Sequence, residues 1–243
     1  MKVLLLGGTG EARRLAEVLS DEFDVVSSLA GRTVDARLPA GVVRQGGFGG
    51  VQGLTDWLSE NAVDAVVDAT HPFAARMTAH AADACRLVGV GVPLLVLRRA
   101  GWREQPGDRW VWVESADEAA DLLPSLGERA FLTIGRQGLD AFASAGVWML
   151  ARCVDPPSVL PSWCELVLDR GPYEVSGELE LLRKRQIDVL VTKDSGGDMT
   201  SAKLVAAREL GLPVVVIKRP PLPAGVAVVS RVDQVAGWLR DRR

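Results

Sequence analysis

Hydrophobic and polar positions follow two alternating patterns along the first hundred residues. Lys2–Leu6 is a continuous apolar run, typical of a parallel strand covered on both faces. Apolar residues within 11–19 recur on one face of a predicted helix, and Asp24–Leu29 is predicted to be the second strand. The chain then predicts a strand, a helix and a strand at 62–68, 77–88 and 92–97. Strands that alternate with helices indicate a doubly wound, mainly parallel sheet.

The second half of the chain repeats this order. A strand, a glycine and a short helix at 130–142 resemble the opening segment, 187–192 resembles 63–68, and 211–219 resembles 91–99. A strand and a helix follow 91–99, at 111–123, and another strand and helix follow 211–219, at 226–239. Ser115 and Ser230, each with an Asp two or three residues later, are the expected starts of these two helices.

This repeat predicts an α/β protein of two Rossmann-like domains with mainly parallel sheets and an interdomain cleft. The first domain is expected to cover residues 1–126 and to bind the cofactor. The second is expected to cover 127–243 and to clamp the substrate, with the join near 125–128. The length of 243 residues suits either one large domain or two small ones.

Composition narrows the classes of function. The net charge of −3 and the absence of any Lys/Arg-rich block give no reason to expect nucleic acid. Three Cys without metal-type spacing and only two His make a metal site improbable. No apolar run approaches the roughly 20 residues of a membrane span. We therefore expect a cytoplasmic protein without a membrane partner, as a monomer or small homo-oligomer.

The glycine-rich loop Gly7-Gly8-Thr9-Gly10 lies directly between the first strand and the first helix. Glycines there let the backbone turn sharply and approach a pyrophosphate, whose charge meets N–H groups at the helix N-terminus. The spacing departs from G-x-G-x-x-G, so a simple tight turn is the alternative. The setting favours a dinucleotide.

The end of the second strand bears on the choice of dinucleotide. Folds that prefer NAD usually have an acidic residue there to hold the ribose 2′-hydroxyl. This chain has Ser28 and, shortly after, Arg32 instead. Hydroxyl and guanidinium groups suit a 2′-phosphate, which favours NADPH, although Arg32 as a solvated loop charge is the alternative.

Three further polar or glycine-rich segments are candidate binding sites. Residues 46–50 place four glycines around Phe48, which allows close approach of a ring or phosphate, or else forms a surface turn with Phe48 as a core anchor. Residues 68–74, with Thr70 and His71, follow a predicted strand, where ligands of open α/β sheets gather. Residues 192–197, with Lys193, occupy the equivalent place in the second half and could hold a carboxylate or phosphate, or form a salt-bridged helix start.

Five motifs, in order, resemble the precorrin-6A reductase family of cobalamin biosynthesis. They are residues 6–13, 28–32, 46–50, 68–74 and 192–196, so the resemblance covers essentially the whole chain. It implies a tetrapyrrole substrate, precorrin-6A, in which hydride from NADPH reduces one double bond to give precorrin-6B. Hydride transfer requires alignment of donor and acceptor and no covalent nucleophile.

The candidate residues divide by role. Those assigned to NADPH are Gly7, Gly8, Thr9, Gly10, Glu11, Ser28, Arg32, Gly47, Phe48, Gly49, Thr70 and His71. Those assigned to the carboxylate-rich substrate are Arg136, Lys193, Ser195, Gly196 and Lys218. His71, Lys193 and Asp194 are the candidates for the proton transfer, with water as a further source.

Two other functions fit the same residues. One is an NADPH reductase acting on a small unsaturated acid, and the other is a protein that senses NADPH without turnover. The paired polar segments favour an enzyme, because a sensor needs only the first. The sequence does not distinguish a metal-free from a cobalt-containing substrate.

Overall fold

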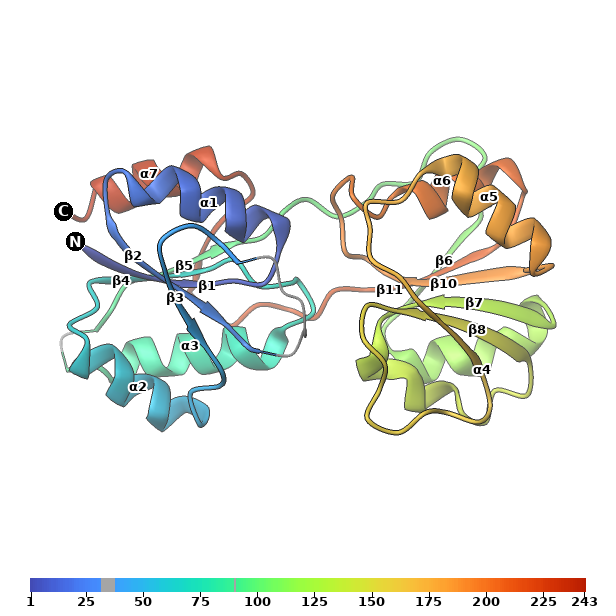
Figure 1. The fold of residues 1–243 in the computed structure, drawn as a ribbon, viewed down its shortest axis with the longest axis horizontal. Helices are drawn as coiled ribbons and strands as arrows, with labels where there is room; N and C mark the ends of the chain where they lie inside the picture. Colours follow the sequence, from blue (N-terminus) through green and yellow to red (C-terminus); the bar gives the residue numbers. More distant parts are fainter. Residues whose placement is uncertain (32–37, 90) are drawn as a thin grey trace. The chain divides into compact units, whose positions relative to one another are not determined.

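The fold is that of a computed structural model, which describes residues 1–31, 38–89 and 91–243. The chain forms two compact α/β units (Figure 1). Unit 1 contains Met1–Ala100 and Pro220–Arg243, and unit 2 contains Gly101–Arg219. This division differs from the expected boundary between residues 126 and 127, because the last strand and helix of each half lie in the other unit.

Unit 1 is built on a six-stranded, wholly parallel sheet in the order β12-β5-β4-β1-β2-β3. The strands are β1 (Lys2–Leu6), β2 (Asp24–Leu29), β3 (Val42–Gln45), β4 (Ala65–Asp68), β5 (Leu94–Leu97) and β12 (Ala227–Val229). The helices are α1 (Gly10–Ser20), α2 (Gly50–Glu60), α3 (Ala75–Leu87) and α7 (Asp233–Arg240). The strand order reverses between β1 and β4.

Helices cover both faces of this sheet (Figure 1). On one face, α1 and α7 pack on alternate residues of the central strands, such as Val3 and Leu5, with Leu239 filling the same core. On the other face, α2 and α3 pack on Leu4 and Leu6. Burial on both faces explains why β1 reads as a continuous apolar run.

Unit 2 has an equivalent parallel sheet in the order β6-β11-β10-β7-β8-β9. Its strands are β6 (Trp110–Val113), β7 (Arg129–Thr133), β8 (Trp148–Cys153), β9 (Glu165–Leu168), β10 (Val189–Lys193) and β11 (Val214–Ile217). Its helices are α4 (Ala116–Leu126), the 3₁₀-helix η1 (Arg136–Phe142), α5 (Val175–Lys184) and α6 (Ala202–Glu209). The strand order reverses between β7 and β10, as it does between β1 and β4.

The elements of the two halves correspond one to one, with a reciprocal exchange at the end of each half. The chain leaves unit 1 after β5, and its next strand, β6, pairs with β11 in unit 2. It leaves unit 2 after β11, and its next strand, β12, pairs with β5 in unit 1. The predicted repeat therefore describes the order of elements correctly, while the predicted join does not describe the packing.

Several predicted elements differ in detail. The predicted strand at 92–97 begins at Leu94, and the predicted helix at 77–88 is Ala75–Leu87. The strand at 62–68 begins only at Ala65, because Ala62 takes a left-handed backbone conformation (φ 48°) that ends the preceding turn. The short helix at 139–142 is the 3₁₀-helix η1 and starts at Arg136. Ser115 accepts a hydrogen bond from the Glu118 N–H and caps α4 as predicted, whereas α7 begins at Asp233 and is not capped by Ser230. Within the described ranges, every helix is too short or too polar to cross a bilayer.

Candidate functional site

The glycine loop of unit 1 lies where the strand order reverses, at the carboxyl ends of β1 and β4. The Gly7 N–H donates to the Ser28 carbonyl (2.9 Å), which joins the loop to the end of β2. Thr9 caps α1 by accepting from the Ala12 N–H (3.1 Å), and its hydroxyl donates to the Ala69 carbonyl beyond β4 (2.8 Å). The loop is thus fixed to both neighbouring strands, and ligands of open α/β sheets bind at such a reversal.

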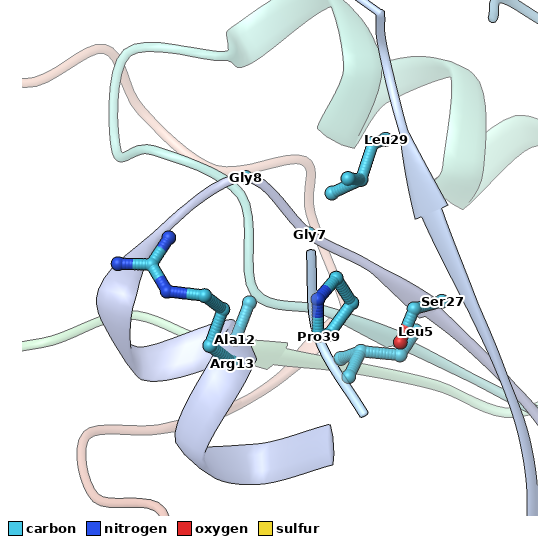
Figure 2. Close-up of a pocket in the computed structure, with 8 residues that line it drawn as sticks. All are labelled: Leu5, Gly7, Gly8, Ala12, Arg13, Ser27, Leu29 and Pro39. Carbon is cyan, nitrogen blue, oxygen red and sulfur yellow. The ribbon is translucent and has the colours of Figure 1, made fainter. Parts of the chain in front are cut away.

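A hollow that is open to solvent lies beside this loop (Figure 2). Its lining residues are Leu5, Gly7, Gly8, Ala12, Arg13, Ser27, Leu29 and Pro39. The Ser27 hydroxyl is buried and has no hydrogen-bond partner among the described residues. An unpartnered buried hydroxyl is costly unless a ligand or water meets it. Arg13, on the first turn of α1, adds a cation to the hollow that the sequence argument did not assign.

Ser28, at the end of β2, is paired in register with Arg44 on β3. The Arg44 guanidinium donates to the Ser28 hydroxyl (2.8 Å) and to the carbonyls of Gly46 (3.1 Å) and Gly47 (3.2 Å). Arg44 was not among the candidates from the sequence. Arg32, which was, lies outside the described residues.

The glycines of residues 46–50 form the turn from β3 into α2. Gly46, Gly49 and Gly50 have positive φ, which favours glycine at these positions. Phe48 is half-buried: its ring packs edge-on against Trp57 (5.6 Å between centroids) and lies under the Arg44 guanidinium (3.7 Å). Phe48 therefore anchors the turn on the core and also supports a cation.

The segment after β4 is held by a buried carboxylate. Asp68 accepts from the Thr70 hydroxyl (2.6 Å) and N–H (3.0 Å), and from the Thr78 hydroxyl on α3 (2.6 Å). His71 Nδ1 accepts from the Phe73 N–H (3.3 Å), so a neutral His71 carries its proton on Nε2 and can act as a donor there.

Glu11, which the sequence assigned to the cofactor, has an ion-pair partner within unit 1. Its carboxylate forms an ion pair with Arg99 just beyond β5 (2.8 Å), which ties α1 to that segment. The Arg99 guanidinium therefore neutralises the Glu11 carboxylate at the N-terminus of α1.

In unit 2, cationic side chains follow the strands that flank the reversal between β7 and β10. Arg136 begins η1 after β7, and one of its guanidinium nitrogens donates to the Pro156 carbonyl (3.0 Å). Lys193 ends β10, and its Nζ lies 3.7 Å from the position of a Cβ at Gly138, so it reaches over η1. Partial burial lowers the pKa of Lys193. The two predicted substrate residues therefore share one edge of the sheet.

The Asp194 carboxylate, by contrast, is occupied by the two connections between the units. Its oxygens accept from the Trp102 N–H (3.0 Å) and pair with the Arg219 guanidinium (3.0 Å). Asp194 is itself buried. This arrangement fits a structural anchor better than the proton donor expected from the sequence.

The remaining predicted substrate residues surround the same edge. Gly196 has a positive φ of 64° in the loop after β10, next to Ser195, whose N–H donates to the Lys193 carbonyl. Lys218 follows β11 and is half-exposed, with its ammonium paired to Glu114 after β6. Lys218 is therefore less available to a substrate than the sequence suggested.

Neither metal binding nor thiol chemistry is indicated by the described residues. They contain no group of three or more His, Cys, Asp or Glu side chains placed to hold a metal ion. Burial raises the pKa of the Cys85 thiol to about 12 and that of Cys164 to about 11, so both stay protonated at neutral pH.

Comparison with known proteins adds independent evidence. A model of the family described as "Precorrin-6x reductase CbiJ/CobK" matches residues 2–240. The precorrin-6A reductase of Rhodococcus erythropolis is 53% identical, covering 98% of this chain and 97% of the relative. The solved structure of a CobK precorrin-6A reductase superposes with a TM-score of 0.92 at 46% identity, covering 100% of this chain and 97% of that one.

This chain belongs to the precorrin-6x reductase family. Its fold, two Rossmann-like domains, and its class, an oxidoreductase that uses a nicotinamide cofactor, follow from that membership. A more distant relative, the cobalt-precorrin-6A reductase of Priestia megaterium, is 28% identical over 96% of each chain.

Proposed function

We propose that this chain catalyses the NADPH-dependent reduction of precorrin-6A to precorrin-6B in cobalamin biosynthesis. The observation that carries the proposal is the family match over residues 2–240 combined with the glycine loop at the reversal of the unit 1 sheet. The greater identity to a precorrin-6A reductase (53%) than to a cobalt-precorrin-6A reductase (28%) favours the metal-free substrate.

The residues of unit 1 fit a phosphorylated dinucleotide. The Gly8 backbone and Arg13 suit the pyrophosphate, and the unpartnered Ser27 hydroxyl offers a donor within the same hollow. Ser28 and Arg44 stand where an acidic residue would select NADH. When bound, NADPH supplies the hydride.

The residues of the chain itself then bind and orient the substrate. We assign Arg136 and Lys193 to its carboxylates, because both are cations at the edge of the unit 2 sheet where its strand order reverses. His71, with its proton on Nε2, is our candidate for positioning or protonating the reacting group. We assign no proton-transfer role to Asp194, because its carboxylate is engaged by Trp102 and Arg219.

The test is a spectrophotometric assay of NADPH oxidation with three acceptors: precorrin-6A, cobalt-precorrin-6A and a small unsaturated diacid. We expect turnover with precorrin-6A and little with the diacid; turnover with the diacid alone would favour the small-acid reductase, and NADPH binding without any oxidation would favour a sensor.

In this assay Lys193→Ala should raise KM for precorrin-6A and leave the Kd of NADPH unchanged, whereas the exposed Lys184→Ala should change neither.

A further inference from the structure

Among the described residues, neutral groups alone hold the Arg44 guanidinium in place beside the end of β2. Its acceptors are the Ser28 hydroxyl and the carbonyls of Gly46 and Gly47. Across residues 1–31, 38–89 and 91–243, no carboxylate lies within 4 Å of its guanidinium. A guanidinium donates five N–H bonds, so these three contacts leave donors for a further acceptor.

The Arg44 guanidinium is also fixed in orientation. It lies 3.7 Å from the centroid of the Phe48 ring and 5.7 Å from that of Trp57. Partial burial lowers the pKa of Arg44, which shows that the charge is partly desolvated, yet the group stays ionised at any physiological pH. A stacked, partly desolvated guanidinium with spare donors is well suited to phosphate.

The position of Arg44 specifies which phosphate it would meet. Ser28 pairs with Leu6 of β1 on one side and with Arg44 on the other, and its carbonyl accepts from Gly7 of the glycine loop. In dinucleotide folds the residue at the end of the second strand binds the adenosine ribose at its 2′ position. The cation that reaches this point comes from the third strand.

We propose that Arg44, oriented by Phe48 and bonded to Ser28, binds the 2′-phosphate of NADPH and is a determinant of NADPH preference over NADH. The inference rests on the proposed function and deepens it, because it assigns the selection to a residue of β3 that the sequence argument did not consider. It also predicts that Arg32 is not sufficient for the preference.

The experiment measures the Kd of NADPH and of NADH for the full-length chain, from the fluorescence of the reduced nicotinamide and without precorrin-6A. Arg44→Met should weaken NADPH roughly tenfold to a hundredfold, the effect of losing a charge-assisted hydrogen bond. The Kd of NADH should change less than about twofold. NADH has a neutral hydroxyl at the 2′ position, so it makes no charge-assisted hydrogen bond that the substitution could remove. Ser28→Asp should lower the preference further, since its carboxylate would pair with Arg44 and repel the phosphate.

Arg242→Met is the matched control. Arg242 is an exposed residue of unit 1 whose guanidinium lies 4.0 Å from the centroid of the Trp238 ring, so its replacement removes the same charge and the same kind of stacking. Both Kd values should stay at the parent level in this variant. A rise in the Kd of NADPH comparable to that caused by Arg44→Met would mean that net charge, and not the position of Arg44, decides binding.

The following results would overturn the inference. If Arg44→Met weakens NADPH and NADH equally while the melting temperature is unchanged, Arg44 only holds the turn at Gly46 and Gly47. If Arg32→Ala abolishes the preference and Arg44→Met leaves it intact, the 2′-phosphate belongs to Arg32. If the parent chain binds both cofactors equally, nothing selects the 2′-phosphate although the reductase activity stands, and if it binds neither, the proposed function fails as well.

Discussion

At the scale of single residues, unit 2 buries the charged side chains of Arg152, Glu178 and Lys203. Arg152 on β8 forms a two-bond ion pair with Glu178 on α5 (2.6 and 2.9 Å), and both are buried. Lys203 on α6 is 4% exposed, donates to the Thr200 carbonyl (3.0 Å) and lies 5.0 Å from the centroid of the Trp102 ring. Burial, reinforced by the nearby positive charge of Arg152, lowers the pKa of Lys203 to about 7.

This burial makes the stability of the protein depend on pH. The unfolded chain keeps Lys203 protonated up to its ordinary pKa of 10.5, whereas the folded chain releases that proton above about 7. The unfolded state therefore binds more protons between these values, and Lys203 makes the free energy of unfolding rise with pH in that window. Between pH 7 and 9, Lys203→Met should reduce this slope by up to about 1.4 kcal/mol per pH unit.

Urea unfolding at several pH values measures the slope. Lys184→Met is the control, because Lys184 ends α5 and is exposed. Its curve should run parallel to that of the parent chain. If the Lys203→Met curve is also parallel, Lys203 is protonated in the folded state throughout this range.

At the scale of elements, the two segments that connect the units are both fixed to the end of β10. Asp194 accepts from the Trp102 N–H at the start of one segment and pairs with Arg219 at the start of the other. The fit is tight: a Cβ at Gly101 would lie 2.6 Å from an Asp194 oxygen. We expect Gly101→Ala to lower the free energy of unfolding by about 1–3 kcal/mol, the usual effect of overpacking.

Gly177→Ala is the comparison for that measurement. Gly177 lies inside α5, where an added Cβ would meet no atom within 4 Å, so the substitution should be neutral or stabilising by about 0.5–1 kcal/mol. Equal stabilities of the Gly101→Ala variant and the parent would show that the Asp194 anchor can shift without loss.

Strands with continuous apolar runs were predictable from the sequence, whereas the edge strand β3 was not. The bounds of β1 and β2 agree with the prediction, because strands buried on both faces leave a continuous apolar run. The edge strand β3 has only four residues and a polar second half, so no run marked it and its Arg44 went unnoticed. Similarly, the partners of Glu11 and Asp194 are distant in sequence, and local patterns carry no information about them.

At the scale of the whole molecule, the exchange of the last strand and helix of each half explains why the predicted boundary was wrong. The strand β12 has three residues, Ala227–Val229, and such a short apolar segment suits the edge of either sheet equally well. The local pattern of apolar residues predicts that a strand and a helix follow β11. Tertiary packing decides which sheet they join. The core of unit 1 includes Val235 and Leu239 from α7, and so it is incomplete without the end of the chain.

This arrangement predicts which fragment folds alone. The Arg98 guanidinium donates to the Pro220 carbonyl (2.9 Å), so the two segments of unit 1 meet close to their ends and a short flexible linker should join 1–100 to 220–243. We expect the joined fragment to melt cooperatively and to bind NADPH.

Fragment 1–126 lacks β12 and α7, leaves Leu95 uncovered, and carries a strand and helix whose sheet is absent. It should aggregate or melt without cooperativity. Calorimetry and NADPH fluorescence compare the two fragments directly. If fragment 1–126 binds NADPH with the affinity of the full chain, the first domain ends at residue 126 after all.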